Sequence, residues 1–413
     1  MATKVIVTKS YLSDIANALR DRFVITETFK VKDMGNKIRE ITTIEDDIIQ
    51  GKLITDDYTN PRVTKIDSTV FSQNYETNLR GGNYSFPNVK SIAETKAFYR
   101  NRGISIDLPK LTSVSNEAFS NSYFETINVP QLTTFSKSAF YNCVNLTTLN
   151  ALMVKTIEST ALRNCSSLQS IDFPLVTKIG GAAFMYSGIT TANFPNLVEL
   201  PEETYDGGGG HSKGSQFCSC ESLTEARFDL IETISTGCFS SCRNLTSFYG
   251  PMVKTVNNYG FYSSGLTAID SSNFPNLETI NNSSFSYCKN LRSVKLSGAA
   301  SLEQSCFSNC SQLEYVDLND VSKLSYGMFP QCPNLKAVII RLLSGGTAPS
   351  IYSNYFTSTP LHTGYTGSDT IGYLYVPRAY YENYTSLSDI RVRVLEDYTI
   401  DGTTTGELDP NKI

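Results

Sequence analysis

A phenylalanine returns at a nearly constant interval along most of the chain. Most steps are 21 or 22 residues, and one longer gap divides the series into two runs. Its members are Phe98, Phe119, Phe140, Leu162, Phe184, Phe217, Phe239, Phe261, Phe285, Phe307 and Phe329, with Phe71 and Phe356 as weaker ends. A fixed period of this length is the signature of a repeat architecture, so we expect each repeat to form one rung of a stacked fold.

Two further apolar positions keep register with this anchor residue. Five residues before it stand Ile66, Val114, Phe135, Ile157, Ile179, Ile234, Val256, Ile280, Leu302 and Leu324. Six residues after it stand Leu146, Leu168, Leu223, Leu245, Leu291, Leu313 and Leu335. A unit of about 22 residues cannot bury its apolar edge alone, so the units are predicted to stack around one continuous core. The segment L-x-x-[IVFL] predicts one short strand per rung and a parallel ladder.

The repeat resembles the leucine-rich repeats of BspA-like proteins, whose unit reads approximately L-x-x-I-x-[FL]-P-x-[VL]-x-x-I-x-x-x-A-F-x-x-C. The segments LTTLNALMVKTIESTALRNC (146–165) and LQSIDFPLVTKIGGAAFMYS (168–187) carry the resemblance, which extends over about residues 60–360. It implies a right-handed solenoid and a general habit of binding other molecules. It implies no chemical activity, because a fold alone does not fix a function.

Both ends depart from the period. Residues 1–59 are predicted to form a helical N-terminal attachment or capping module, 60–345 the solenoid, and 346–413 an α+β C-terminal cap with a polar tail. In the cap we expect a strand over 372–377, a helix over 378–387 and a strand over 390–395. The N-terminal segment resembles a module of phage and prophage tail-associated proteins of Gram-positive bacteria. The matching residues are Leu12, Ile15, Ala16, Asn17, Ala18, Leu19, Arg20, Phe29, Met34 and Ile38.

Composition narrows the possible partners. A net charge of −5 with 18% charged residues does not favour binding to nucleic acid. No apolar run reaches the roughly 18 residues of a membrane span. The start of the chain lacks the apolar stretch of a secretory signal, which fits a protein assembled in the bacterial cytoplasm.

The ten cysteines are the most tempting chemical groups. Seven stand three residues after an anchor: Cys143, Cys165, Cys220, Cys242, Cys288, Cys310 and Cys332. Serine fills the same position elsewhere, so we expect small, buried, reduced side chains in a tight turn. Cys218 and Cys220 lack the second pair of ligands that a zinc site needs, and nothing orients His211 for catalysis. We therefore predict no catalytic residue, no metal and no cofactor. The glycine-rich insertion 201–214 is either a flexible surface excursion or a loop that contacts a partner.

The outward positions of the predicted ladder are the candidate ligand-binding residues, because side chains alternate across a strand. They are Thr148, Asn150, Ser170, Asp172, Glu225, Arg227, Ser247, Tyr249, Ser293, Lys295, Tyr315 and Asp317. This polar, partly aromatic row is typical of a surface that recognises a glycan or a protein. We expect a non-enzymatic receptor-binding, baseplate or fibre protein of a phage tail, located in the virion. It would contact a host surface glycan or protein, and other tail proteins through its N-terminal module. The alternative is a leucine-rich repeat adhesin on the bacterial surface. A glycan-degrading enzyme would need a candidate site, and none is found.

Overall fold

The computed structural model describes residues 57–61, 63–66, 71–72, 81–203, 213–341, 351, 355–356 and 358–395. They form a parallel β-solenoid of about 13 turns. The chain divides into two compact units, Met1–Val154 with Cys165–Leu168, and Lys155–Asn164 with Gln169–Ile413. The repeat region is thus a solenoid, as its period predicts.

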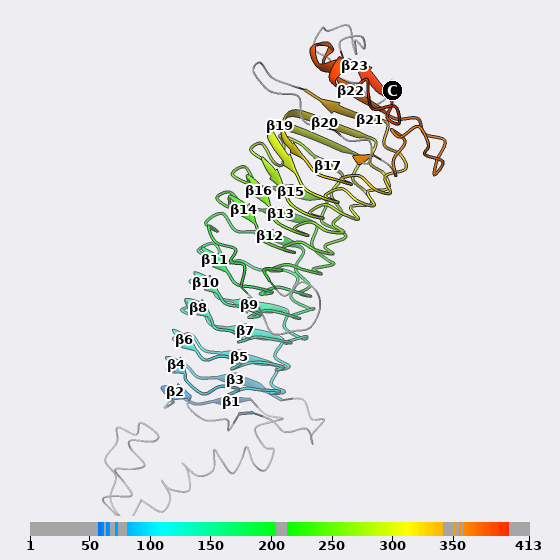
Figure 1. The fold of residues 1–413 in the computed structure, drawn as a ribbon. Helices are drawn as coiled ribbons and strands as arrows, with labels where there is room; N and C mark the ends of the chain where they lie inside the picture. Colours follow the sequence, from blue (N-terminus) through cyan, green and yellow to red (C-terminus); the bar gives the residue numbers. More distant parts are fainter. Residues whose placement is uncertain are drawn as a thin grey trace, which may run out of the picture. The chain divides into compact units, whose positions relative to one another are not determined.

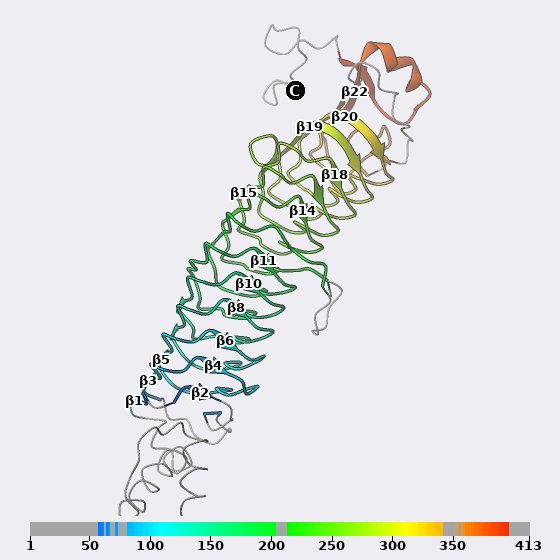
Figure 2. The same cartoon turned by 90° about the vertical axis from the view of Figure 1, so that its left-hand side faces the viewer.

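Each complete rung of the first unit contributes two short strands, in separate ladders. The first ladder has the order β1 (Tyr58–Thr59), β3 (Asn83–Ser85), β5 (Ser105–Asp107), β7 (Thr126–Asn128) and β9 (Thr148–Asn150). The second contains β2 (Lys65–Ile66), β4 (Ser91–Ile92) and β6 (Ser113–Val114), and β8 (Thr134–Phe135) follows in the chain. Figure 1 labels both columns, and the second ladder faces the viewer in Figure 2.

The second unit repeats the arrangement. One sheet has the order β12 (Thr191–Asn193), β13 (Glu225–Arg227) and β15 (Ser247–Tyr249). In the other ladder β10 (Thr156–Ile157) pairs with β11 (Lys178–Ile179), and a separate sheet begins with β14 (Thr233–Ile234), β16 (Thr255–Val256) and β18 (Thr279–Ile280). The strand β17 (Ala268–Ile269) pairs with the strand that follows β18. Two long strands, β19 (Ser293–Leu302) and β20 (Tyr315–Leu324), pair with both ladders or continue them. The sheet then ends with β21 (Ala337–Ile340), β22 (Tyr373–Val376) and β23 (Val392–Val394), all in parallel.

The predicted fold class was therefore wrong in the number of strands per rung and in its N-terminal module. Most rungs have two strands rather than one, because the apolar residue five positions before the anchor also lies in a parallel pair, as Ile234 does with Val256. The structure is 3% helical and has no helix of seven or more residues among those described, so a helical N-terminal module is not supported. Residues 1–56 themselves lie outside the described residues.

The C-terminal cap has no α-helix either. The segment predicted to be helical contains only a 3₁₀-helix, η4 (Arg378–Asn383). Tyr, Asn and Thr are weak helix formers, and a segment this short cannot offset the cost of helix nucleation. The strands predicted on either side of it are present as β22 and β23, and they extend the parallel sheet of the solenoid.

The anchor phenylalanines form the core by stacking ring on ring. In the second unit the Phe217 and Phe239 centroids lie 5.3 Å apart, and those of Phe239 and Phe261 lie 5.1 Å apart. Phe184 stacks directly on Phe217 at 5.1 Å, although 33 residues separate them in sequence. The insertion between these two anchors therefore leaves the core in register.

Tight turns hold every anchor from Phe98 to Phe329. The residues two positions before and two after each anchor have positive φ, as Glu117 (57°) and Asn121 (59°) do beside Phe119. This left-handed conformation strains most side chains, and Asn tolerates it better than most residues do. Backbone hydrogen bonds tie the turns of successive rungs together, including Phe119 N–H to Ala139 O at 2.8 Å. The result is a rigid edge that presents the same backbone positions on every rung.

Candidate recognition surface

The structure exposes most of the predicted ladder residues. Eight are exposed or half-buried in defined strands: Thr148, Asn150, Glu225, Arg227, Ser247, Tyr249, Ser293 and Lys295. Ser170 and Asp172 are exposed too, but the segment 168–173 that holds them has no strand. The ladder face is thus accessible over much of its length, although it is discontinuous.

In the first unit, neighbouring side chains on this face bond to one another. The Asn150 amide donates to Asn128 Oδ1 at 2.6 Å, and the Asn128 amide donates to Asp107 Oδ1 at 2.6 Å. An amide that bonds to the equivalent residue of the next rung stabilises the stack in the way amide ladders do in stacked sheets. Asn150 therefore has a structural partner, which the sequence pattern alone does not reveal.

Arg227 and Tyr249 form the most distinctive pair of the ladder face in the second unit. The guanidinium of Arg227 lies over the Tyr249 ring, 4.7 Å from its centroid. The same guanidinium contacts Asp229 at 2.9 Å. Cation–π contacts of this kind hold both side chains in place at the surface.

Two predicted ligand residues, Tyr315 and Asp317, are buried, so their assignment to the binding face was wrong. Tyr315 is 8% exposed and packs in a cluster with Ala337, Ile339, Tyr375 and Leu395. The reason lies in the continuous apolar run of β21, which is buried on both faces. Such runs are typical of strands covered on both sides, a signal that the alternation argument overlooked.

Asp317 is only 2% exposed. It is engaged by Arg341, whose Nε and Nη2 lie 2.8 and 3.0 Å from the two carboxylate oxygens. The hydroxyl of Tyr315 also lies 3.4 Å from Asp317 Oδ2. This bidentate pair belongs to the internal structure of the C-terminal end and is not available to a ligand.

The tight-turn edge carries exposed tyrosines that the sequence argument missed. The Tyr262 ring lies 5.8 Å from that of Tyr259 and 5.2 Å from that of Tyr287, on the following rung. Tyr287 is 40% exposed, and burial together with these neighbouring phenols raises the pKa of Tyr262. Their positions in the sequence could have indicated this edge, because each of the three tyrosines stands one or two residues from an anchor.

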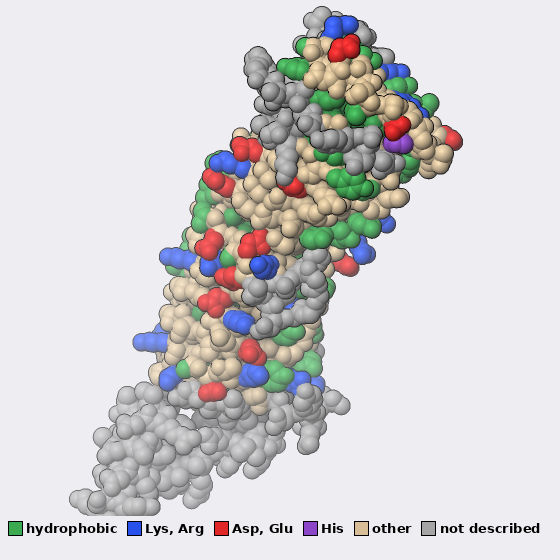
Figure 3. Space-filling view, viewed as in Figure 1, with side chains coloured by type: hydrophobic (Ala, Val, Ile, Leu, Met, Phe, Trp, Pro, Cys, Tyr) green, Lys and Arg blue, Asp and Glu red, His purple; other side chains and the backbone are tan. Residues whose placement is uncertain are grey.

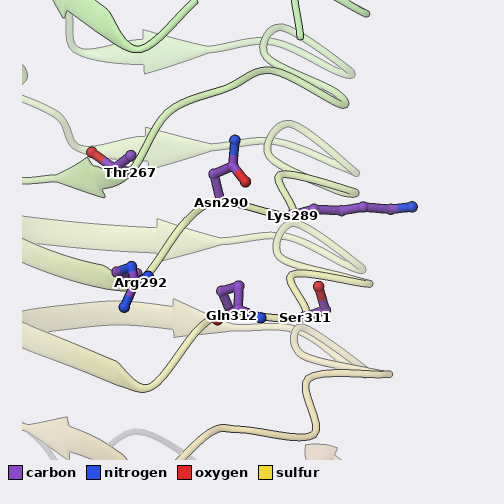
Figure 4. A pocket seen from close by; sticks show the side chains of 6 residues that line it. All are labelled: Thr267, Lys289, Asn290, Arg292, Ser311 and Gln312. Atoms are coloured by element: carbon purple, nitrogen blue, oxygen red, sulfur yellow. The ribbon is translucent and has the colours of Figure 1, made fainter. Parts of the chain in front are cut away.

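A groove opens on the same part of the second unit. It has a volume of about 430 Å³ and is lined by Thr267, Lys289, Asn290, Arg292, Ser311 and Gln312, from three successive rungs (Figure 4). All six side chains are polar, and none is a carboxylate. Charges of both signs are scattered over the face seen in Figure 3. The lining of the groove has two cations and no anion.

The cysteines are packing and hydrogen-bonding residues in this structure. All ten are buried as free thiols, which confirms their predicted burial. Burial raises the pKa of the Cys220 thiol to about 12, although a hydrogen bond with Ser187 partly opposes the rise. A thiol that resists deprotonation is a poor nucleophile and a poor metal ligand.

His211 and most of the insertion, residues 204–212, lie outside the described residues. No group of three or more His, Cys, Asp or Glu residues that could hold a metal ion occurs among the residues that the structure describes.

Stacked parallel rungs, an internal phenylalanine column and a polar outer surface define a leucine-rich repeat solenoid of the binding type. The BspA type leucine-rich repeat region matches the chain in six copies, over residues 90–207, 213–336 and 254–375. The chain belongs to this family. None of the matches is to a catalytic family, and none supports the tail-protein resemblance of the N-terminal segment. No curated protein matches the chain.

Several solved structures are similar to the chain in fold. The pneumococcal vaccine antigen PcpA is 16% identical, with 84% of this chain and 90% of that chain covered and a TM-score of 0.42. A leucine-rich repeat protein from Bacteroides ovatus is 18% identical, with 82% and 92% covered and a TM-score of 0.38. A leucine-rich cell surface protein from Faecalibacterium prausnitzii is 18% identical, with 81% and 87% covered and a TM-score of 0.29. Within the described residues, the structure contains no helix with the length and apolar character of a membrane span.

Proposed function

We propose that the chain is a non-enzymatic binding protein that recognises a glycan or a protein on a bacterial surface through the tight-turn edge of its second unit. The observation that carries the proposal is the contact of Tyr262 with Tyr259 and Tyr287. Three partly exposed rings that support one another across two rungs form a rigid aromatic platform. Tyrosines suit recognition because each has a rigid apolar body and a polar tip, and they lose little conformational entropy on binding.

The ladder face is the competing surface, with Arg227 and Tyr249 as its best-defined residues. We favour the turn edge because these two side chains already contact each other and Asp229, and Asn150 is similarly bonded within the first unit. A ligand on the ladder would have to compete with these contacts. Tyr287 offers an exposed ring without a charged partner stacked on it among the described residues.

The test is binding of the labelled chain to bacterial cells. Tyr262→Ala/Tyr287→Ala is expected to weaken binding by more than about 1 kcal/mol, as loss of aromatic anchors usually does. Arg227→Ala/Tyr249→Ala is the matched control, since it also removes a surface aromatic contact. Equal binding by the parent and the turn-edge variant, with loss in the control, would place recognition on the ladder.

Two biological settings fit such a binding protein. A surface adhesin is compatible with the family. A tail-associated protein of a phage or prophage is the finer alternative, and it rests on the resemblance of the segment from Leu12 to Ile38. A truncation that starts at Asn60 separates the two settings. Failure of the truncated chain to incorporate into phage particles that take up the full chain would support the tail role. Absence of the full chain from particles would exclude it.

A further inference from the structure

Among the turns that hold the anchors from Phe98 to Phe329, three are one residue shorter than the others. Long turns run from an anchor through cysteine to leucine six residues on, as in Cys288-Lys-Asn-Leu291. The short turns have serine in place of cysteine and reach their apolar residue after only five. They are Ser122-Tyr-Phe124, Ser187-Gly-Ile189 and Ser264-Gly-Leu266. The groove described above lies directly after the last of these, because Thr267 lines one of its walls.

The shortened turn leaves an amide without its usual partner. The asparagines five residues after Phe239 and Phe329, Asn244 and Asn334, each donate at 2.8 Å to a backbone carbonyl of the preceding turn. Asn290 occupies the same position but follows the short turn. Its side chain has no hydrogen bond with any described residue, and it projects toward the rung that holds Thr267 in Figure 4. Its donor and acceptor groups are therefore available in the groove.

The two cations of the groove are also available. Lys336 and Lys254 pair with Glu314 and Glu232 at 3.0 and 3.4 Å. Lys289 and Arg292, in contrast, have no ion pair with any described residue, and both side chains are exposed. Two unpaired positive charges in one groove, on a chain of net charge −5, create a local site for an anion.

This combination occurs at one short turn of the three. The residues that correspond to Lys289 and Arg292 after the turn at Ser187 are Glu221 and Thr224. After the turn at Ser122 they are Val144 and Thr147. The shortened turn thus occurs three times, whereas the pair of cations occurs only after the turn at Ser264, in the groove lined by Thr267.

We propose that this groove binds an acidic saccharide through its carboxylate or sulfate group, a proposal that rests on the function proposed above. The planar guanidinium of Arg292 fits two oxygens of such a group, and the Lys289 ammonium adds a mobile second charge. The amides of Asn290 and Gln312 and the hydroxyls of Thr267 and Ser311 donate to and accept from sugar hydroxyls. Tyr287, two residues before Lys289, presents an exposed ring on the same turn. The recognised chemistry is therefore an anionic group on a hydroxyl-rich ring.

The test measures the affinity of the full chain for three probes by titration calorimetry. They are a galacturonic acid oligomer with carboxylates, a sulfated glycosaminoglycan oligomer and a neutral malto-oligosaccharide of similar length. The variant Lys289→Glu/Arg292→Thr installs the residues that the solenoid itself carries after the turn at Ser187, so the turn is compatible with them. The control Lys155→Gln/Lys254→Gln removes two positive charges from the second unit but leaves the groove intact. Thermal unfolding of each variant checks that it is folded.

We expect the parent to bind at least one acidic probe, and the groove variant to raise its Kd at least about tenfold, while the control changes it less than about twofold. The acidic probe that binds more tightly identifies carboxylate or sulfate as the natural group. Equal affinity for the neutral probe, or unchanged affinity in the groove variant, would overturn the proposal. If the parent binds cells but neither acidic probe, the groove assignment fails and the binding function stands. If it binds neither cells nor probes, both fail.

Discussion

The thiol of Cys242 lies 3.0 Å from the backbone carbonyl oxygen of Phe217, the anchor of the preceding rung. The same contact, at 3.0 to 3.2 Å, joins Cys143 to Phe119, Cys165 to Phe140, Cys220 to Phe184, Cys288 to Phe261, Cys310 to Phe285 and Cys332 to Phe307. The cysteine position is therefore more than a small gap in a tight turn. Each thiol donates one rung back and helps to fix the spacing of the stack.

Replacing Cys242 with alanine should lower the free energy of unfolding by about 1–2 kcal/mol. The change removes a weak hydrogen bond and leaves a small void in a fully buried site. Denaturant unfolding of the parent and the variant measures the difference. Cys218→Ala is the control, since Cys218 is 8% exposed and makes no carbonyl contact of this kind. An equal loss in the two variants would contradict a role for the repeated contact.

The buried thiols should also make stability depend on alkaline pH. Burial raises the pKa of Cys143 from 9.0 to about 12 and that of Cys288 to about 11, although hydrogen bonds with Ser122 and Ser264 partly oppose this. The folded chain thus holds these protons more tightly than the unfolded chain. The corresponding stability is fully present below about pH 9 and is lost as pH rises toward the folded-state values.

The measurement is the urea midpoint of the parent between about pH 8 and about pH 10.5, compared with that of Cys143→Ala/Cys288→Ala. Tyrosines titrate over the same range in both chains, so the difference in slope reports the two thiols. We expect the steeper decline in the parent. Parallel slopes would mean that these thiols do not carry the pH dependence.

Phe239 gives the sharpest test of the core. It is fully buried and stacks between Phe217 and Phe261. Phe239→Ala should cost about 3–5 kcal/mol of unfolding free energy, because the cavity interrupts the ring column. Phe239→Leu should cost clearly less, since Leu162 already occupies an anchor position in this chain. Chemical denaturation compares the two, and similar losses would show that the column needs aromatic rings rather than volume.

The sequence was sufficient to predict the solenoid and its anchors, because one large residue per repeat must enter the shared core. It did not predict the second ladder, since strands such as Thr233–Ile234 have only two residues and too few positions to show alternation. It also misplaced Tyr315. Whether an outward side chain is exposed depends on the neighbouring strands, here Ile339 and Tyr375, which the periodicity of one rung does not contain.

The groove lay beyond the sequence argument for a different reason. Its cause, the loss of one residue between Ser264 and Leu266, is visible in the sequence once the long and short turns are aligned. Its effect is that the Asn290 side chain, near Arg292, has no hydrogen bond with a described residue. That effect depends on which backbone carbonyl of the preceding turn lies within reach of the amide. The recurring apolar positions alone do not reveal such a deletion.

Gly265, in the short turn between Ser264 and Leu266, packs closely against the preceding rung. A Cβ built on Gly265 would lie 2.4 Å from the carbonyl oxygen of Arg243, which is a backbone atom that cannot move alone. Gly265→Ala should therefore destabilise the second unit or push the short turn outward. The glycine is required by close packing against the preceding rung, and φ there is not in the left-handed region.

The ion pair of Asp317 and Arg341 provides the last prediction. Asp317 is 2% exposed and the Arg341 side chain 21%, so each charge depends on the other inside the C-terminal end of the second unit. Asp317→Ala should cost about 3–5 kcal/mol, because it removes the carboxylate that pairs with a largely buried guanidinium. Asp317→Ala/Arg341→Leu should recover part of that loss, since it also removes the cation that has lost its carboxylate. Denaturant unfolding of the two variants measures this recovery. If Asp317→Ala were as stable as the parent, Asp317 would contribute little as a buried partner and would again be a candidate for contact with a ligand.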